Sequence, residues 1–336
     1  MKIAVLAPVA WRTPPRHYGP WEQMSSNIAE GLHAEGVDVT LFATSDSITD
    51  GKLEAVIARG YEEDRSQDAK VVECLHISNL MERAAGFDII HNNYDFLPLT
   101  YSGLVKTPVI TTIHGFSSEK IIAVYKKYNS RSGYVSISNA DRSDQLDYLA
   151  TVYNGIKVSD FIYNDTPGDY LLYFGRIHPD KGTAEAIEIA VKSKRRLLIA
   201  GIIQNQAYFD ERINPLLNDE IIFIGDAGPE KRNKLLGHAL ALLHPINFDE
   251  PFGLSVAEAM LCGTPVIAFN RGSMPELIVD GKTGFLVKTV EEAVDAVADI
   301  ERINRLDCHQ WSLANFSQEK MVREYLGIYD LILAKA

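Results

Sequence analysis

The sequence contains few cysteines. Only three occur in 336 residues, Cys74, Cys262 and Cys308, and none forms a Cys-x-x-Cys pair. An odd and scattered set excludes a disulfide scaffold and argues against a zinc site built on thiolates. We therefore expect a cytoplasmic protein.

Long apolar runs are missing as well. No stretch approaches the roughly 18 consecutive apolar residues that a membrane-spanning helix needs, so no stable membrane insertion is expected. The apolar start MKIAVLAPVA lacks a positively charged region and a cleavage site. It predicts a first strand rather than a signal peptide.

An excess of positive charge is absent too. The chain has 33 Lys and Arg against 45 Asp and Glu, a net charge of −12, which argues against a nucleic-acid partner. A few local cations can still bind an anionic small molecule. No G-x-G-x-x-G motif follows a predicted strand, which argues against an NAD-dependent dehydrogenase.

What the sequence does contain is an alternation of short apolar runs and helical stretches over a length of about two ~150-residue domains. The predicted strands are residues 2–6, 37–42, 88–91, 109–113, 134–137, 170–174, 197–200, 221–224, 241–244, 265–269 and 284–287. Such alternation predicts an α/β protein with two doubly wound parallel sheets. The polar segment 150–169 is the expected boundary, and ligands should bind at the carboxyl ends of the strands.

The segment EPFGLSVAEAM, which starts at Glu250, follows a predicted strand and opens a helix. Gly253 permits close approach of a ligand to the backbone, and Ser255 is the expected N-cap. Amides of Leu254 and Ser255, with the helix dipole, predict an anion site. The alternatives are that Ser255 and Glu258 form a capping box and that Glu250 is a solvated loop acid.

A second candidate is the loop FGRIHPDKG, in which Arg176 and Lys181 follow a strongly apolar strand. A guanidinium fork and a lysine ammonium are suited to a diphosphate. Two loop cations can equally be ordinary surface charges.

Two histidines end predicted strands of the first half, His91 and His114. His114 precedes a glycine and is a candidate site residue, although a structural role is an equal alternative. No Asp-x-Asp or metal-ligand pattern accompanies the two histidines, so no metal site is expected.

Taken together, four segments resemble the retaining glycosyltransferases of family 4, in order and spacing along nearly the whole chain. They are the E-x7-E element from Glu250 to Glu258, the Gly175-Arg176…Lys181-Gly182 loop, the Tyr153-Asn-Gly-Ile156 linker and the Thr112-x-His114-Gly115 strand end.

The resemblance implies a GT-B fold of two Rossmann-like domains. Residues 1–152 would bind the acceptor and residues 153–316 the nucleotide sugar, while 317–336 would form a helix crossing back to the first domain. The implied activity is retaining hexosyl transfer to a hydroxyl of a small or glycan acceptor. A UDP-sugar is the preferred donor and GDP-mannose the alternative, with no metal and no cofactor.

The resemblance also implies roles for individual residues. Glu250 would contact hydroxyls of the donor sugar, and Glu258 the ribose. Arg176 and Lys181 would hold the diphosphate and stabilise its growing charge, and His114 would lie near the reacting centre. Backbone amides of the segment from Phe252 through Gly253 and Leu254 to Ser255 would bind the sugar and the β-phosphate.

One region departs from the family pattern. The N-terminal Gly-Gly-x-Glu loop appears here as GPWE from Gly19, which could still admit a phosphate, but Pro20 removes a donor amide. The preceding stretch is the candidate acceptor contact, through two aromatic side chains that can stack on sugars and two cations that can meet an anionic acceptor. These four residues are Trp11, Tyr18, Arg12 and Arg16. The alternative is a loop that packs on its own domain.

Two other functions use the same fold. A GT-B sugar phosphorylase would act on a sugar phosphate without a nucleotide, and a non-catalytic partner would bind a nucleotide sugar without turnover. The sequence makes no prediction about oligomeric state.

Overall fold

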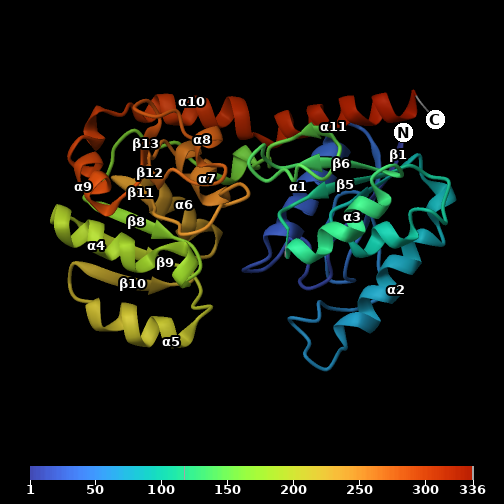
Figure 1. Cartoon of the computed structure of the whole chain (residues 1–336), viewed down its shortest axis with the longest axis horizontal. Coiled ribbons are helices and arrows are strands. Elements are labelled where there is room, and N and C mark those ends of the chain that lie inside the picture. Colours follow the sequence, from blue (N-terminus) through green and yellow to red (C-terminus); the bar gives the residue numbers. More distant parts are fainter. Residues whose placement is uncertain (117, 335–336) are drawn as a thin grey trace. The chain divides into compact units, whose positions relative to one another are not determined.

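The computed structural model describes residues 1–116 and 118–334, which form two compact units (Figure 1). Unit 1 consists of Met1–Gly155 and the chain from Gln318 onward, and unit 2 of Ile156–Ser317. Each unit contains one sheet whose strands all pair in parallel, which confirms the predicted fold class.

Unit 1 has the strand order β3-β2-β1-β4-β5-β6-β7. Its strands are β1 (Lys2–Leu6), β2 (Asp38–Phe42), β3 (Lys52–Glu54), β4 (Ile89–Asn92), β5 (Val109–Ile113), β6 (Ser132–Ser136) and β7 (Tyr148–Thr151). Its helices are α1 (Pro20–Ala34), α2 (Ala69–Met81), α3 (Ile122–Tyr128) and α11 (Gln318–Leu333).

Unit 2 has the order β10-β9-β8-β11-β12-β13. Its strands are β8 (Tyr170–Phe174), β9 (Arg196–Ala200), β10 (Ile221–Gly225), β11 (Ala241–His244), β12 (Val266–Phe269) and β13 (Gly284–Val287). Its helices are α4 (Thr183–Ser193), α5 (Gln206–Tyr208), α6 (Pro229–His238), α7 (Leu254–Leu261), α8 (Met274–Leu277), α9 (Val290–Ala298) and α10 (Arg305–Phe316).

Strand β1 shows why these strands are continuous apolar runs. Ile3 and Val5 pack into one core with α1 and α11, whereas Ala4 and Leu6 pack into another with α2. Because successive side chains of a strand point to opposite faces, a sheet covered by helices on both sides needs apolar residues at every position.

Helix α11 packs in the core of unit 1, although it follows unit 2 in the sequence (Figure 1). Two of its tyrosines enter a buried polar network. The Tyr329 hydroxyl lies 2.6 Å from Nδ1 of His91, the Tyr325 hydroxyl lies 2.7 Å from Oγ1 of Thr112, and that oxygen lies 2.7 Å from Nε2 of His91. Both ring nitrogens of His91 are therefore engaged inside unit 1, which gives this residue a structural role.

Two strands escape the sequence prediction, β3 and β7. Both are edge strands of unit 1, and the residues of β7 are half-buried or exposed. An edge strand needs no continuous apolar run, so its sequence resembles a loop. For this reason the polar boundary segment predicted from residue 150 overlaps the end of β7.

Candidate active site

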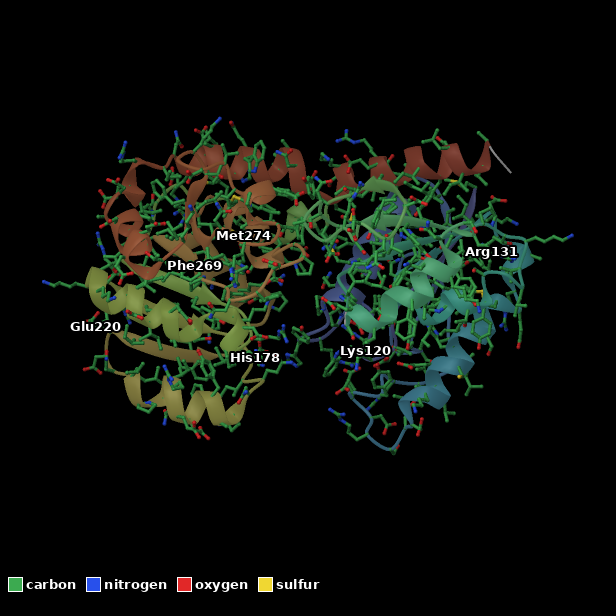
Figure 2. The ribbon with its side chains drawn as sticks, in the orientation of Figure 1. Lys120, Arg131, His178, Glu220, Phe269 and Met274 are labelled. Atoms are coloured by element: carbon green, nitrogen blue, oxygen red, sulfur yellow. The ribbon has the colours of Figure 1, made fainter. Side chains whose placement is uncertain are left out.

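In the sheet of unit 2, the strands are added in one direction from β8 to β10 and in the opposite direction from β11 to β13. The strand order therefore reverses between the neighbouring strands β8 and β11. In doubly wound sheets, ligands bind at such a point, outside the carboxyl ends of the strands. Two loops leave the sheet there, the β8 loop (residues 175–182) and the β11 loop (residues 245–253). They carry the predicted residues Arg176, Lys181 and Glu250, and His178 of the β8 loop is labelled in Figure 2.

The two loops touch because of a glycine. Gly182 has φ +72°, and a Cβ there would lie 1.8 Å from the carbonyl oxygen of Pro245, so any larger residue would push the loops apart. A hydrogen bond of 2.7 Å from the amide of Asn247 to the carbonyl oxygen of Asp180 adds a second link.

Lys181 and Glu250 form an ion pair across these loops. The Lys181 ammonium donates to Oε2 of Glu250, and both side chains are about 85% buried, with exposures of 15% and 14%. The same ammonium lies 4.6 Å from the centroid of the Phe248 ring. The structure therefore brings together a cation and an acid that the sequence places 69 positions apart.

Arg176 lies on the β8 loop but points to a different partner. Its guanidinium donates to the side-chain oxygen of Gln204, and its carbonyl accepts a 2.8 Å hydrogen bond from the Tyr173 hydroxyl. The backbone of Arg176 is thus anchored to the sheet, while its side chain is half-buried at the strand end.

Helix α7 begins two residues earlier than predicted. Its N-cap is Gly253, with φ +90° and no side-chain hydrogen bond, and Leu254 is the first helical residue. The prediction of Ser255 as N-cap is wrong, because the left-handed conformation needed here is one that glycine adopts readily. With Ser255 inside the helix, the alternative of a capping box with Glu258 is wrong too. The first amides of α7 have no intrahelical acceptor and suit an anion.

Glu258 is buried on α7 and faces a cation instead. Its Oε1 lies 3.3 Å from Nη1 of Arg232, whose guanidinium stacks 5.1 Å from the ring centroid of Phe161. Burial raises the pKa of the Glu258 carboxyl, and the Arg232 charge opposes this increase. Phe252, by contrast, is core: its ring packs edge-on against Phe316, and its carbonyl accepts from the Ser273 hydroxyl.

In unit 1 the corresponding reversal lies between β1 and β4, and His114 follows the next strand, β5. Its Nε2 lies 2.9 Å from Oδ1 of Asn93, and Trp21 lies 6.3 Å away between ring centroids. Burial lowers the pKa of His114 to about 3, so the imidazole is neutral at pH 7. Nδ1 of His114 and Nδ2 of Asn93 are buried without a hydrogen-bond partner among the described residues.

The loop before α1 packs on unit 1 through its cations. Arg16 bridges Asp46 at 3.0 Å and Glu63 at 2.6 Å, and Nε of Arg12 donates to the carbonyl oxygen of Pro14. Both arginines that were predicted to contact an anionic acceptor therefore already have partners in unit 1. Arg16 is paired with two carboxylates, and Arg12 donates to a backbone carbonyl. Tyr18 is partly exposed at the end of this loop.

The start of α1 buries an acid that the sequence analysis did not single out. Glu22 is 3% exposed and accepts a 3.2 Å hydrogen bond from the amide of Trp11. Burial raises the pKa of its carboxyl to about 7. Gly19 is required just before it, because a Cβ there would lie 2.9 Å from Cβ of Pro15.

The sequence analysis also missed three residues that adjoin predicted site residues. They are Asn93 beside His114, Arg232 beside Glu258 and His244 beside Glu250. Asn93 and His244 stand at the carboxyl ends of apolar strands, and that position alone could have identified them. Arg232 lies within a polar helix, where no sequence signal separates it from a surface cation.

Within residues 1–116 and 118–334, no cluster of three or more His, Cys, Asp or Glu side chains is arranged to hold a metal ion. Over the same residues, no helix is both long and apolar enough to cross a membrane.

Comparison with known sequences finds a family match in unit 2. Residues 159–316 match the family Glycosyl transferases group 1. Sucrose synthase of Solanum tuberosum is 39% identical over 79 residues, which cover 23% of this chain and 10% of that enzyme. Glycogen synthase of Mycobacterium tuberculosis is 24% identical over 335 residues, covering 82% of this chain and 80% of that enzyme.

Solved structures match the fold of the whole chain. Sucrose-phosphate synthase of Thermosynechococcus elongatus has a TM-score of 0.80 at 18% identity and is covered completely, as is this chain. Anabaena HepE in complex with UDP and glucose has a TM-score of 0.74 at 18% identity, covering 98% of this chain and 99% of that one. The chain thus has the fold of GT-B glycosyltransferases, and most of its unit 2, residues 159–316, matches the family Glycosyl transferases group 1.

Proposed function

We propose that this protein is a retaining glycosyltransferase of family 4, which transfers a hexosyl group from a nucleoside-diphosphate sugar to a hydroxyl group. The observation that carries the proposal is the Lys181–Glu250 pair at the reversal point of the unit 2 sheet, with Glu258 on the helix that follows. This arrangement offers a cation for a diphosphate and two acids for two sets of sugar hydroxyls.

The chemistry that we propose depends on the charge of the leaving group. As the bond between the anomeric carbon and the diphosphate oxygen breaks, negative charge grows on the diphosphate. Arg176, Lys181 and the first amides of α7 would stabilise that charge. Preorganised hydrogen-bond donors directed at developing charge lower the activation free energy strongly. The leaving phosphate would accept the proton of the attacking hydroxyl on the same face, so that the anomeric configuration is retained.

We assign the remaining contacts as follows. Glu250 would accept hydrogen bonds from hydroxyls of the transferred sugar, and Glu258 from the ribose hydroxyls. His114 would contact substrate from unit 1 through its neutral imidazole. Since Arg16 is paired with acids and the Asn93–His114 pair is uncharged, we propose a neutral hydroxyl-bearing acceptor, small or glycan in nature.

The donor that we propose is a UDP-sugar, with GDP-mannose as the alternative. The support is that HepE, whose fold is similar, was solved with UDP and with UDP-glucose. We further propose that the reaction needs no metal, because two cations and helix amides are available at the strand ends. Transfer in the presence of a chelating agent tests this point directly.

The first experiment is a thermal-shift screen of the purified protein against UDP, GDP, ADP and their hexose conjugates without added metal. We expect one nucleotide to raise the melting temperature, Glu258→Ala to lose this increase, and the exposed-site control Glu301→Ala to keep it. A response to sugar phosphates alone would favour the sugar phosphorylase. Nucleotide-sugar binding without consumption, over a broad acceptor panel, would favour a non-catalytic partner.

The anomeric configuration of the product tests retention. Proton NMR of the initial product should show the same anomeric configuration as the donor. The opposite configuration would contradict the assignment to a retaining family while leaving glycosyl transfer intact.

A further inference from the structure

A buried histidine stands beside the proposed sugar-binding acid. His244 is the last residue of β11, and its side chain is 8% exposed. Among the described residues, its Nε2 atom is buried without a hydrogen-bond partner. Such an atom in a native structure calls for an explanation, because buried polar groups are normally paired.

This atom faces the carboxylate of Glu250. Nε2 lies 3.8 Å from Oε2 of Glu250, too far for a hydrogen bond but close enough for a small side-chain movement to make one. That same carboxylate oxygen is held by the ammonium of Lys181. One oxygen of Glu250 therefore has one present partner and one potential partner.

The charge state of His244 defines its role. Burial lowers the pKa of His244 to about 4; Glu250 opposes this shift, and Lys181 reinforces it. The imidazole is thus neutral at pH 7 and carries one ring proton. A carboxylate facing Nε2 favours the tautomer with that proton on Nε2, since two lone pairs would otherwise repel each other.

We propose that His244 is a positioning residue for Glu250. This inference rests on the function proposed above. When a diphosphate draws the Lys181 ammonium away from Glu250, the Nε2–H of His244 takes over the released oxygen. Lys181 can then neutralise the leaving group without leaving Glu250 as an unpartnered buried carboxylate.

The exchange separates two tasks that the resting ion pair combines. Lys181 serves the diphosphate, while Glu250 stays oriented toward the sugar hydroxyls through a neutral donor. A neutral donor suits this place because it does not compete with the diphosphate for Lys181, whereas a second cation beside Lys181 would repel it.

The test compares His244→Leu and His244→Met, which lack the ring N–H, with His244→Gln, which restores a neutral donor. With the UDP-sugar, or the GDP-sugar if the thermal-shift screen selects it, we expect kcat of the Leu and Met variants to fall about tenfold. The Kd for the free nucleoside diphosphate should stay within about twofold, and Gln should recover kcat to within about threefold of wild type. In a Glu250→Gln background, adding His244→Leu should cause no further loss of kcat.

A second readout needs no substitution. The ¹⁵N shifts of the His244 ring, assigned in the wild-type protein, should report Nε2 protonated before and after addition of the nucleoside diphosphate. The Nε2–H proton should move downfield on binding, as a new hydrogen bond forms. This measurement keeps the proposal testable if the Leu and Met variants do not fold.

Three results would overturn the proposal: wild-type kcat in both the Leu and Met variants, a Gln variant as impaired as they are, or a ring proton unaffected by the nucleotide. Each is distinguishable from failure of the proposed function. That failure would appear as no transfer by the wild-type protein with any donor, or as near-normal transfer by Glu250→Ala.

Discussion

The two units are built alike but present different chemistry at the carboxyl ends of their strands. Unit 2 presents charged pairs there, Lys181 with Glu250 and Arg232 with Glu258. Unit 1 presents the neutral pair Asn93 and His114. Two sheets of the same type therefore carry different charges near their strand ends, because a handful of side chains differs between them.

The sharpest test of this difference removes one arginine from each unit. We expect Arg176→Ala to lower kcat/KM for transfer by about 10²–10³-fold, because a donor that stabilises developing charge is lost. Arg16→Ala should change kcat/KM by less than about threefold, since that guanidinium already forms partly exposed ion pairs with Asp46 and Glu63. Initial rates with one donor and one acceptor measure both, and similar losses in the two variants would break the comparison.

Buried acids also distinguish the units, because Glu258 has a cation beside it, whereas Glu22 accepts backbone hydrogen bonds. The pKa of Glu22 is raised from 4.5 to about 7, so its stabilising contribution is present below pH 4.5 and is lost as the pH rises through 7. We expect Glu22→Gln to increase the free energy of unfolding by up to about 3 kcal/mol at pH 8 and by almost nothing at pH 4.5.

Calorimetric unfolding at these two pH values measures the effect. Glu258→Gln should gain less at pH 8, because Arg232 then loses its partner. A pH-independent gain for Glu22→Gln would show that packing, rather than ionisation, changes its stability.

For the buried polar network of His91, Thr112, Tyr325 and Tyr329 in unit 1, we expect a smaller effect on stability. Tyr329→Phe leaves Nδ1 of buried His91 without a partner and should cost about 1–2 kcal/mol of unfolding free energy. The control Tyr101→Phe, at a partly buried tyrosine of the same unit, should cost less than about 0.5 kcal/mol. Chemical denaturation followed by circular dichroism compares them, and equal costs would deny the network a role in holding α11.

The smallest expected effect concerns salt. Raising the salt concentration from about 0.05 to 0.3 M should increase the KM for the donor about threefold, since the charged contacts of unit 2 are screened. The KM for a neutral acceptor should change by less than about twofold, because Asn93 and His114, where we propose that the acceptor binds, are uncharged. A KM for the donor that does not depend on salt would contradict the distinction between the charged strand ends of unit 2 and the uncharged pair of unit 1.

Most strands could be predicted from sequence because burial on both faces demands continuous apolar runs, as in β1 and β11. Edge strands β3 and β7 could not, because half of their environment is solvent or loop. Arg176, Lys181 and Glu250 could be picked out from the sequence because they are charged residues in the loops that follow apolar strands.

The partners of those charges could not be predicted. Nothing in the spacing of Arg16 indicates that Asp46 and Glu63 neutralise it, and nothing in a Ser-x-x-Glu pattern shows that Gly253 caps α7 while Glu258 turns to Arg232. Pairs of this kind join residues far apart in the sequence.

By itself, the sequence determined that the protein has two parallel sheets covered by helices, and it located the loops that follow the strands. These features depend on local periodicity and on burial. Only the tertiary structure decided which charges are engaged and that His244 stands beside Glu250. It also decided that both ring nitrogens of His91 are engaged, whereas Nδ1 of His114 has no hydrogen-bond partner among the described residues. The physical reason is that hydrogen bonds and ion pairs act over a few ångströms in space. The sequence orders residues along the chain, and the fold alone brings distant ones within that range.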